Sequence, residues 1–135
     1  MNLHQIHLVQ TTFALVHAEA NLFVTQLYNH LLRLDPCLYY LLPQEMEAHN
    51  KEFILILAEI VDGLSRPYLL IHNTLKPLGH QYAAYNIRPT HYHTFATALR
   101  LALANILGPA FTTEVEAAWM DAYYLVIGVI KETRK

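Results

Sequence analysis

The chain has 135 residues, of which 54% are hydrophobic and 15% are charged, and it contains only four glycines. This composition indicates one compact globular domain over residues 1–135 and excludes a disordered or repetitive chain. Nine lysines and arginines against eleven acidic residues leave a formal charge of −2, which argues against nucleic acid or an anionic membrane as a partner. No apolar run is long enough for a membrane span and no signal peptide is recognisable, so we expect a cytoplasmic protein.

The hydrophobic pattern is helical from the N-terminus onward. Residues 5–34 have apolar positions at spacings of three and four, which predicts one or two helices ending at Asp35-Pro36. Residues 46–64 carry another apolar stripe and predict a helix that frays near Gly63.

The second half continues the same pattern. Residues 90–107 predict a long amphipathic helix that is closed by Gly108. The last helix has an apolar face over residues 115–130, and Thr113 with Glu116 predicts a capping box at its start. Strand signals are absent, so the sequence predicts an all-α domain with short connections.

The nine histidines, nine tyrosines and single cysteine call for a functional explanation. Cys37 has no partner for a disulfide or a paired-cysteine metal site, and we expect it to pack as a small buried residue. His91 and His93 point to opposite sides of a helix and cannot face one metal ion. His4 and His7 have a suitable spacing but lie at an exposed terminus. We interpret both pairs as solvated.

Two ionisable side chains fall on apolar helix stripes. His49 shares a stripe with Phe53, and Tyr28 lies between Val24 and Leu31 at helical spacing. Taken alone, each side chain is a core residue bonded to backbone or water. Taken together, they suggest a pocket. The sequence motifs of common hydrolases, kinases and zinc peptidases are absent, so we assign no catalytic residue.

Short stretches along nearly the whole chain match one known family in order and spacing. They are Leu27-Tyr28, Asp35-Pro36, Leu41-Leu42-Pro43, Ala48-His49, Leu78-Gly79, Ile87-x-Pro89-x-His91-Tyr92, Leu107-Gly108-Pro109 and Ala118-Trp119. The sequence resembles single-domain globins of the bacterial haemoglobin, flavohaemoglobin and neuroglobin-like kind. The resemblance implies a globin fold of six to eight helices, with haem b between the helix that carries His49 and the helix that ends near Tyr82. It also implies a small diatomic ligand.

On the distal side, the resemblance implies that the polar pocket residues are kept. Tyr28 falls on the tyrosine that donates a hydrogen bond to bound oxygen in bacterial members. His49 falls where the family has a distal Gln or His, and Phe53 falls at the apolar position one turn further on. Ile87 and Tyr92 fall among the other cofactor contacts.

On the proximal side, the sequence departs from the family. Tyr82 occupies the position of the histidine that binds iron, and the spacing to Tyr92 fixes this register. His80 lies two residues earlier, on the other face of a regular helix, so it becomes the alternative ligand only if the helix is shifted or unwound. His91 matches an ordinary helix-start histidine, and we do not assign it to iron.

Three further haem contacts also differ from the family. Leu42 replaces a Phe that wedges against the porphyrin. Glu52 falls where a Lys often pairs with a haem propionate, and Gln81 replaces another basic residue. Each lost propionate pair at a solvated edge is worth on the order of 1 kcal/mol. The departures from the family pattern therefore fall at positions that contact the haem in family members.

Three functions follow from this pattern. The first is a haem protein with non-standard axial ligation through Tyr82, His49 or both. Its function is redox, nitric-oxide, peroxide or sensing chemistry. Its enzymatic activity is at most a peroxidase-like or nitric-oxide-dioxygenase-like side activity that needs a separate reductase. The second is a haem-free globin fold that serves as a sensor or interaction module. Its pocket is filled by large side chains or holds another apolar small molecule, such as a bilin or fatty acid. The residues that would fill it are Phe53, Leu42, Tyr39, Tyr40 and Tyr92.

The third function is ordinary reversible oxygen binding, with His80 or a rearranged helix supplying the proximal nitrogen. For each of the three, the apolar face of the last two helices is compatible with a homodimer.

Overall fold

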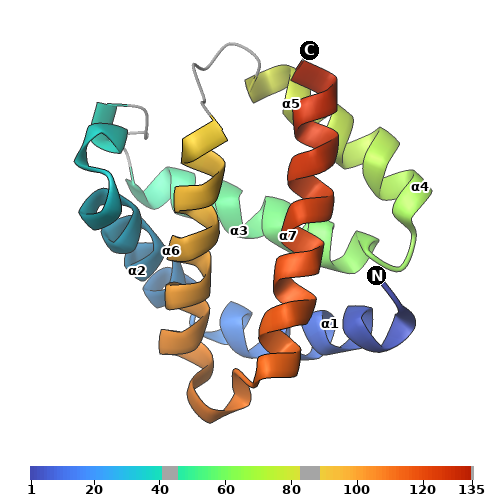
Figure 1. Cartoon of the computed structure of the whole chain (residues 1–135), viewed down its shortest axis with the longest axis horizontal. Coiled ribbons are helices and arrows are strands. Elements are labelled where there is room, and N and C mark those ends of the chain that lie inside the picture. The colour runs from blue at the N-terminus through green and yellow to red at the C-terminus, as the bar shows by residue number, and fades with distance from the viewer. Residues whose placement is uncertain (41–45, 83–88, 135) are drawn as a thin grey trace.

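The computed structural model describes residues 1–40, 46–82 and 89–134, and these ranges are helical almost throughout (Figure 1). No strand occurs in them, which confirms the all-α prediction. The elements are α1 (Leu3–Ala18), α2 (Ala20–Leu34), η1 (Pro36–Tyr40), α3 (Met46–Gly63), α4 (Pro67–Leu69), η2 (Leu70–Leu75), α5 (Lys76–Tyr82), α6 (Pro89–Leu107), η3 (Gly108–Ala110) and α7 (Thr113–Arg134). Elements η1 and η3 are 3₁₀ turns, whereas η2 is a π-helical turn.

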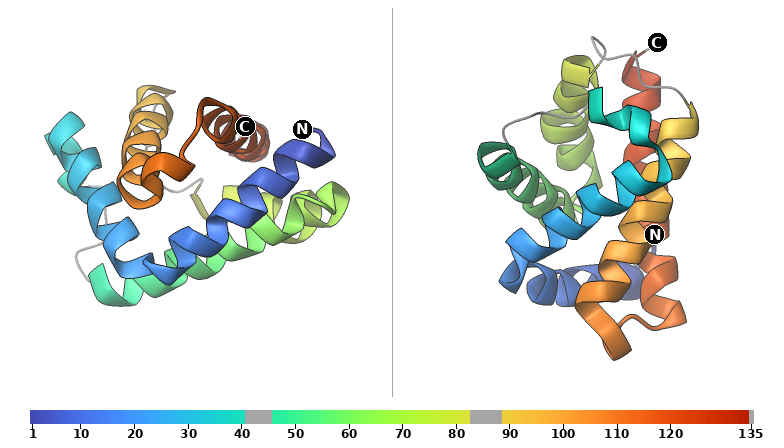
Figure 2. Two further views of the ribbon diagram at one scale, coloured as in Figure 1. Left: turned by 90° about the horizontal axis from the view of Figure 1, so that it is seen from below. Right: turned by 90° about the vertical axis from the view of Figure 1, so that its left-hand side faces the viewer.

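The long helices pack across one another in pairs. Figure 1 shows α6 and α7 running antiparallel in front of α3, with α1 across one end of both. Helix α2 packs on α6, and α5 packs on the C-terminal half of α7. Figure 2 shows α1 alongside α3 on the opposite side of the molecule. Residues far apart in the sequence thus share one core.

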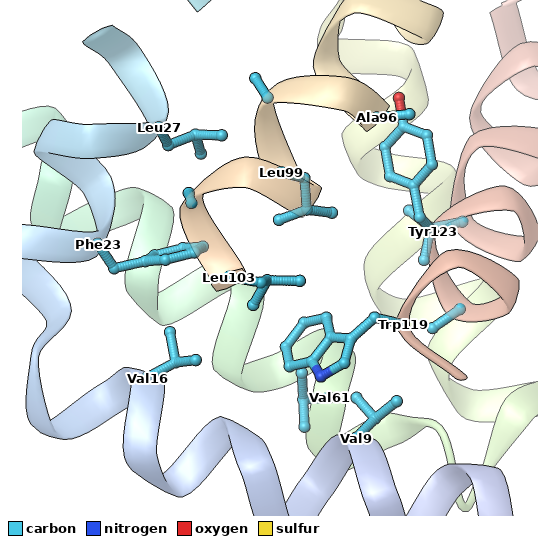
Figure 3. Close-up of a cluster of buried hydrophobic side chains, with 14 of the residues drawn as sticks. Val9, Val16, Phe23, Leu27, Val61, Ala96, Leu99, Leu103, Trp119 and Tyr123 are labelled. Carbon is cyan, nitrogen blue, oxygen red and sulfur yellow. The ribbon is translucent and has the colours of Figure 1, made fainter. Parts of the chain in front are cut away.

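The Trp119 indole lies among buried apolar side chains of the core (Figure 3). Phe23 of α2, Leu103 of α6 and Trp119 of α7 point toward one another, and their side chains are buried. The Trp119 indole Nε1 donates a hydrogen bond to Oγ1 of Thr12 at 2.9 Å. Thr12 Oγ1 in turn donates to the carbonyl of Leu8 at 2.7 Å. The indole is therefore satisfied, as a buried N–H group must be.

Local capping explains several helix ends. Helix α1 begins after Asn2, whose side chain accepts a hydrogen bond from the Gln5 N–H while the Gln5 side chain accepts one from the Asn2 N–H. Gly108 ends α6 with a φ of 53°, a left-handed conformation that favours glycine. The predicted boundaries of the helices over 46–64 and 90–107 are confirmed to within a residue or so.

Two predictions about the short connections are wrong. The capping box at Thr113 does not form, because α7 already begins at Thr113 and the cap is the preceding residue: Thr112 Oγ1 accepts the Val115 N–H at 3.2 Å. Cys37 is exposed rather than buried. In the short turn η1 the buried position goes to Leu38, which is 6% exposed, and the Cys37 N–H donates to the Asp35 carboxylate.

None of the helices in the described ranges has the length and apolar character that a membrane crossing requires.

Candidate functional site

The distal tyrosine candidate is buried. Tyr28 lies on α2 with 5% of its side chain exposed, and its helix neighbours Val24 and Leu31 are also buried. The expectation of a phenol on a core-facing stripe is thus confirmed. A tyrosine hydroxyl placed among apolar side chains is shielded from bulk solvent.

Helix α3 brings His49 and Phe53 onto one helix face, because they are four residues apart. His49 lies in the first turn, and its side chain is outside the described part of the chain. Phe53 is half-buried, and its ring centroid lies 6.5 Å from that of Phe95 on α6. The candidate cofactor contacts Leu42 and Ile87 lie outside the described residues.

Helix α5 ends at Tyr82, whose side chain is likewise outside the described part. The same short helix exposes His80 and Gln81 to solvent and buries Leu78. The exposed side of α5 is therefore the side that carries His80. A regular α5 turns the alternative iron ligand away from the interior.

The position of α5 depends on a close contact with α7. A Cβ atom on Gly79 would lie 2.8 Å from Cβ of Thr133 and 3.4 Å from the carbonyl oxygen of Ile130. Real Cβ atoms do not approach so closely, so only glycine allows α5 to pack at this distance. The contact holds in place the helix that carries Tyr82.

The first turn of α6 is tied to α7 through Tyr92. The Tyr123 hydroxyl donates a hydrogen bond to the carbonyl oxygen of Tyr92 at 2.6 Å. The ammonium group of Lys131 lies 4.9 Å from the centroid of the Tyr92 ring, within range of a cation–π interaction. Burial, and secondarily the neighbouring Tyr124 and Tyr92, raise the pKa of Tyr123 well above its ordinary range. The Tyr123 phenol therefore stays protonated.

Sequence reasoning missed the way aromatic rings connect these helices. The Phe95 ring stacks on Tyr123 with centroids 5.8 Å apart and an interplanar angle of 7°. Tyr123 meets the edge of Tyr124 at 5.4 Å. Together with the contact between Phe53 and Phe95, the rings run from α3 through α6 to α7. Phe95 lies within the amphipathic helix predicted over residues 90–107, but no local signal indicated its partners.

In the part of the chain that the structure describes, the surface histidines do not gather into a metal centre. His4 bonds Glu114 at 2.6 Å, while His7 and His93 are exposed. His91 was expected to be solvated, but its side chain is only 17% exposed and its Nε2 lies 3.9 Å from the carboxylate of Asp35. Within the described ranges, no group of three His, Cys, Asp or Glu residues could hold a metal ion.

The comparisons with known proteins agree with this arrangement of helices. The family model described as Globin matches residues 43–130. The chain belongs to the globin family. It is similar to a flavohemoprotein of Xylella fastidiosa (strain Temecula1), with 26% identity over 132 residues that cover 96% of this chain and 33% of that protein. A flavohemoprotein of Vibrio cholerae is 21% identical over 130 residues, or 92% of this chain and 32% of that protein.

This globin therefore spans about one third of the length of those two curated relatives. Among solved structures, it resembles the hemoglobin from the botfly Gasterophilus intestinalis, with a TM-score of 0.86, 11% sequence identity and coverage of 99% of both chains. This likeness confirms the predicted globin fold.

Proposed function

We propose that this globin binds haem between α3 and α5 through non-standard axial ligation, with Tyr82, His49 or both as iron ligands. Membership of the globin family and similarity to flavohemoproteins support a haem cofactor. The observation that carries the unusual ligation is the end of α5. Its last residue is a tyrosine, whereas His80, the nearest histidine on that helix, is exposed.

The described residues fit a planar apolar group with a polar centre. Phe53 and Phe95 offer rings on one side, and the buried Tyr28 offers a hydroxyl. Asn50, which follows His49 on α3, has a buried Oδ1 atom without a hydrogen-bond partner in the described part of the chain. Such an acceptor supports a site that a cofactor or an ordered water completes. Phenolate and imidazole are both established haem ligands.

The solvent edge of the pocket supports weaker haem binding than a cationic edge would. Glu52 on α3 and Gln81 on α5 are both exposed. Neither can neutralise a haem propionate, and the Glu52 carboxylate repels it. Each lost ion pair is worth about 1 kcal/mol or less at a solvated position. Haem retention then depends mainly on axial ligation and apolar contacts.

The pocket residues favour redox or sensing chemistry over oxygen storage. A haem held by a phenolate supplies ferric iron, which binds oxygen poorly and reacts with peroxide or nitric oxide. The Tyr28 hydroxyl donates a hydrogen bond to a small ligand in the pocket. The imidazole of His49 accepts and returns a proton when it is not itself a ligand.

The test is a titration of the purified protein with ferric haem, followed by absorption spectra of the Tyr82→Phe and His49→Ala variants. Equimolar uptake with a sharp Soret band, and a spectrum altered by at least one substitution, is the expected result. Tyr68→Phe is the matched control, because Tyr68 is 72% exposed and lies between α3 and η2.

Two outcomes would overturn the proposal. Absence of stoichiometric uptake would indicate the haem-free globin, with a filled pocket or another apolar ligand. A six-coordinate bis-histidine spectrum that His80→Ala abolishes would indicate an ordinary oxygen-binding haemoglobin with a rearranged α5.

A further inference from the structure

Four aromatic rings form a continuous series from the proposed pocket to the surface. Phe53, Phe95, Tyr123 and Tyr124 meet at centroid distances of 6.5, 5.8 and 5.4 Å in that order. These distances are typical of direct ring contacts. The inner ring, Phe53, lies one helical turn from His49 on α3. The outer ring, Tyr124, is 57% exposed. We call these four residues the ring series.

The two tyrosines of the series differ in what they can do with a proton. A phenol that gives up an electron becomes a strong acid, so it needs a proton acceptor. The Tyr123 hydroxyl donates to the carbonyl of Tyr92, which is too weak a base to take the proton. Its pKa is also raised by burial. Tyr124 has open access to solvent water, so the phenolic proton can leave.

Tyr124 also borders an open groove that a small molecule can enter. The groove has a volume of about 530 Å³ and lies between α7 and the segment formed by η2 and α5. Leu125 and Val129 give it apolar walls, and Lys76 and Glu132 also line it. A small reductant can thus reach the Tyr124 ring in a groove whose two charged side chains, Lys76 and Glu132, have opposite signs.

We propose that Tyr124 is the surface end of an electron path that leads through Tyr123, Phe95 and Phe53 to the haem pocket. This inference rests on the proposed haem binding. The phenyl rings of Phe53 and Phe95 bridge the path without being oxidised. Tyr123 passes the electron inward, and Tyr124, which supplies that electron, remains as the phenoxyl radical. A reductant of the ene-diol class, such as ascorbate, then restores Tyr124.

The electrons and protons balance with hydrogen peroxide as the oxidant. Two Tyr124 phenols each lose one electron inward and one proton to water, which yields two phenoxyl radicals. The two electrons and two protons reduce one hydrogen peroxide molecule to two water molecules. One ascorbate monoanion gives up two electrons and its ionisable hydrogen as a proton; with one further proton from water, this restores two phenols and leaves dehydroascorbate. Without ascorbate, two phenoxyl radicals on different chains couple through a new carbon–carbon bond to dityrosine.

The experiment treats the haem-loaded protein with hydrogen peroxide in the absence of ascorbate. The readouts are tyrosyl radical signals in electron paramagnetic resonance, dityrosine fluorescence, and mass spectrometry of the covalent dimer. We expect the cross-link at Tyr124 and its loss in Tyr124→Phe. We expect a smaller yield in Tyr123→Phe, which retains the ring but removes the intermediate phenol. Ascorbate should suppress the cross-link in the unmodified sequence.

Tyr68→Phe is the matched control, because Tyr68 is more exposed than Tyr124 but touches His72 rather than the ring series. Cross-linking at Tyr68 as readily as at Tyr124, or an unchanged yield in Tyr124→Phe, would overturn the electron path. Haem uptake is measured first on every variant. Failure to take up haem would overturn the proposed function and the path together, whereas haem uptake with Tyr124 unmodified would overturn the path alone.

Discussion

The hydrogen bond from Tyr123 to Tyr92 couples the stability of α7 to the helix that follows the proposed pocket. Tyr123→Phe removes a hydroxyl that donates at 2.6 Å to a carbonyl of α6, while the phenyl ring keeps its stacking on Phe95. The Tyr92 carbonyl belongs to α6 and remains part of the backbone hydrogen bonding of that helix. The loss of free energy of unfolding is therefore close to the net value of one hydrogen bond. We expect a decrease of about 1 kcal/mol in the free energy of unfolding.

The assay is urea denaturation followed by far-ultraviolet circular dichroism. Tyr124→Phe is the control, because its side chain is 57% exposed and a change there should stay within about 0.5 kcal/mol. Equal losses for the two variants would refute the assignment of the effect to the hydrogen bond.

The raised pKa of Tyr123 predicts that the same variant changes the stability of the protein at alkaline pH. The pKa of Tyr123 is raised in the folded protein, so above pH 10 the unfolded chain releases a proton that the folded chain keeps. Stability therefore falls as pH rises above the unfolded pKa, by at most about 1.4 kcal/mol per pH unit from this group. Tyr123→Phe should remove that part of the slope. A slope unchanged between pH 10 and pH 11 would contradict the raised pKa.

Two substitutions test the packing that positions the helices. Thr12→Val should lower the free energy of unfolding by about 1–3 kcal/mol in urea denaturation, because it leaves the buried Trp119 indole N–H without its acceptor. A loss below about 0.5 kcal/mol would mean that the indole finds another partner. Gly79→Ala should cost about 1–3 kcal/mol by the same measurement, because its Cβ would meet Thr133 at 2.8 Å. Gly128→Ala is the control, because the new Cβ has open space around it and should instead raise stability by up to about 1 kcal/mol. A Gly79→Ala variant as stable as the Gly128→Ala variant would contradict the close crossing of α5 and α7.

The fold was predictable because each long helix carries its own periodicity. The apolar face over residues 115–130 predicted α7, and Val115, Trp119 and Val126 from that face are buried. The partners of those residues were not predictable. Trp119 bonds a threonine 107 positions away in the chain. Such a contact depends on how α1 and α7 cross, which no local pattern encodes.

The short connections were less predictable than the helices. Cys37 was expected to be buried because small apolar residues usually are, but in the short 3₁₀ segment η1 the neighbouring Leu38 takes the buried position instead. The capping residue of α7 was displaced by one position, since Thr112 and Thr113 offer the same side chain in succession.

The candidate site was predictable in part. The apolar stripe around Tyr28 predicted the burial of its phenol, and the resemblance to globins placed His49 and Tyr82 on two different helices. The stacking of Phe95 on Tyr123 arises only when α6 and α7 pack together, and the open groove beside Tyr124 arises only when η2 and α5 pack along α7. These features therefore required the structure.

Resonance Raman spectroscopy of the ferric haem-loaded protein, grown with ring-deuterated tyrosine, tests the central claim most directly. Ligation by Tyr82 predicts phenolate vibrations that shift with the deuterium label and disappear in Tyr82→Phe. A spectrum that does not shift with the deuterium label, is unchanged in Tyr82→Phe and shows only imidazole ligation would contradict tyrosine as an iron ligand in this globin.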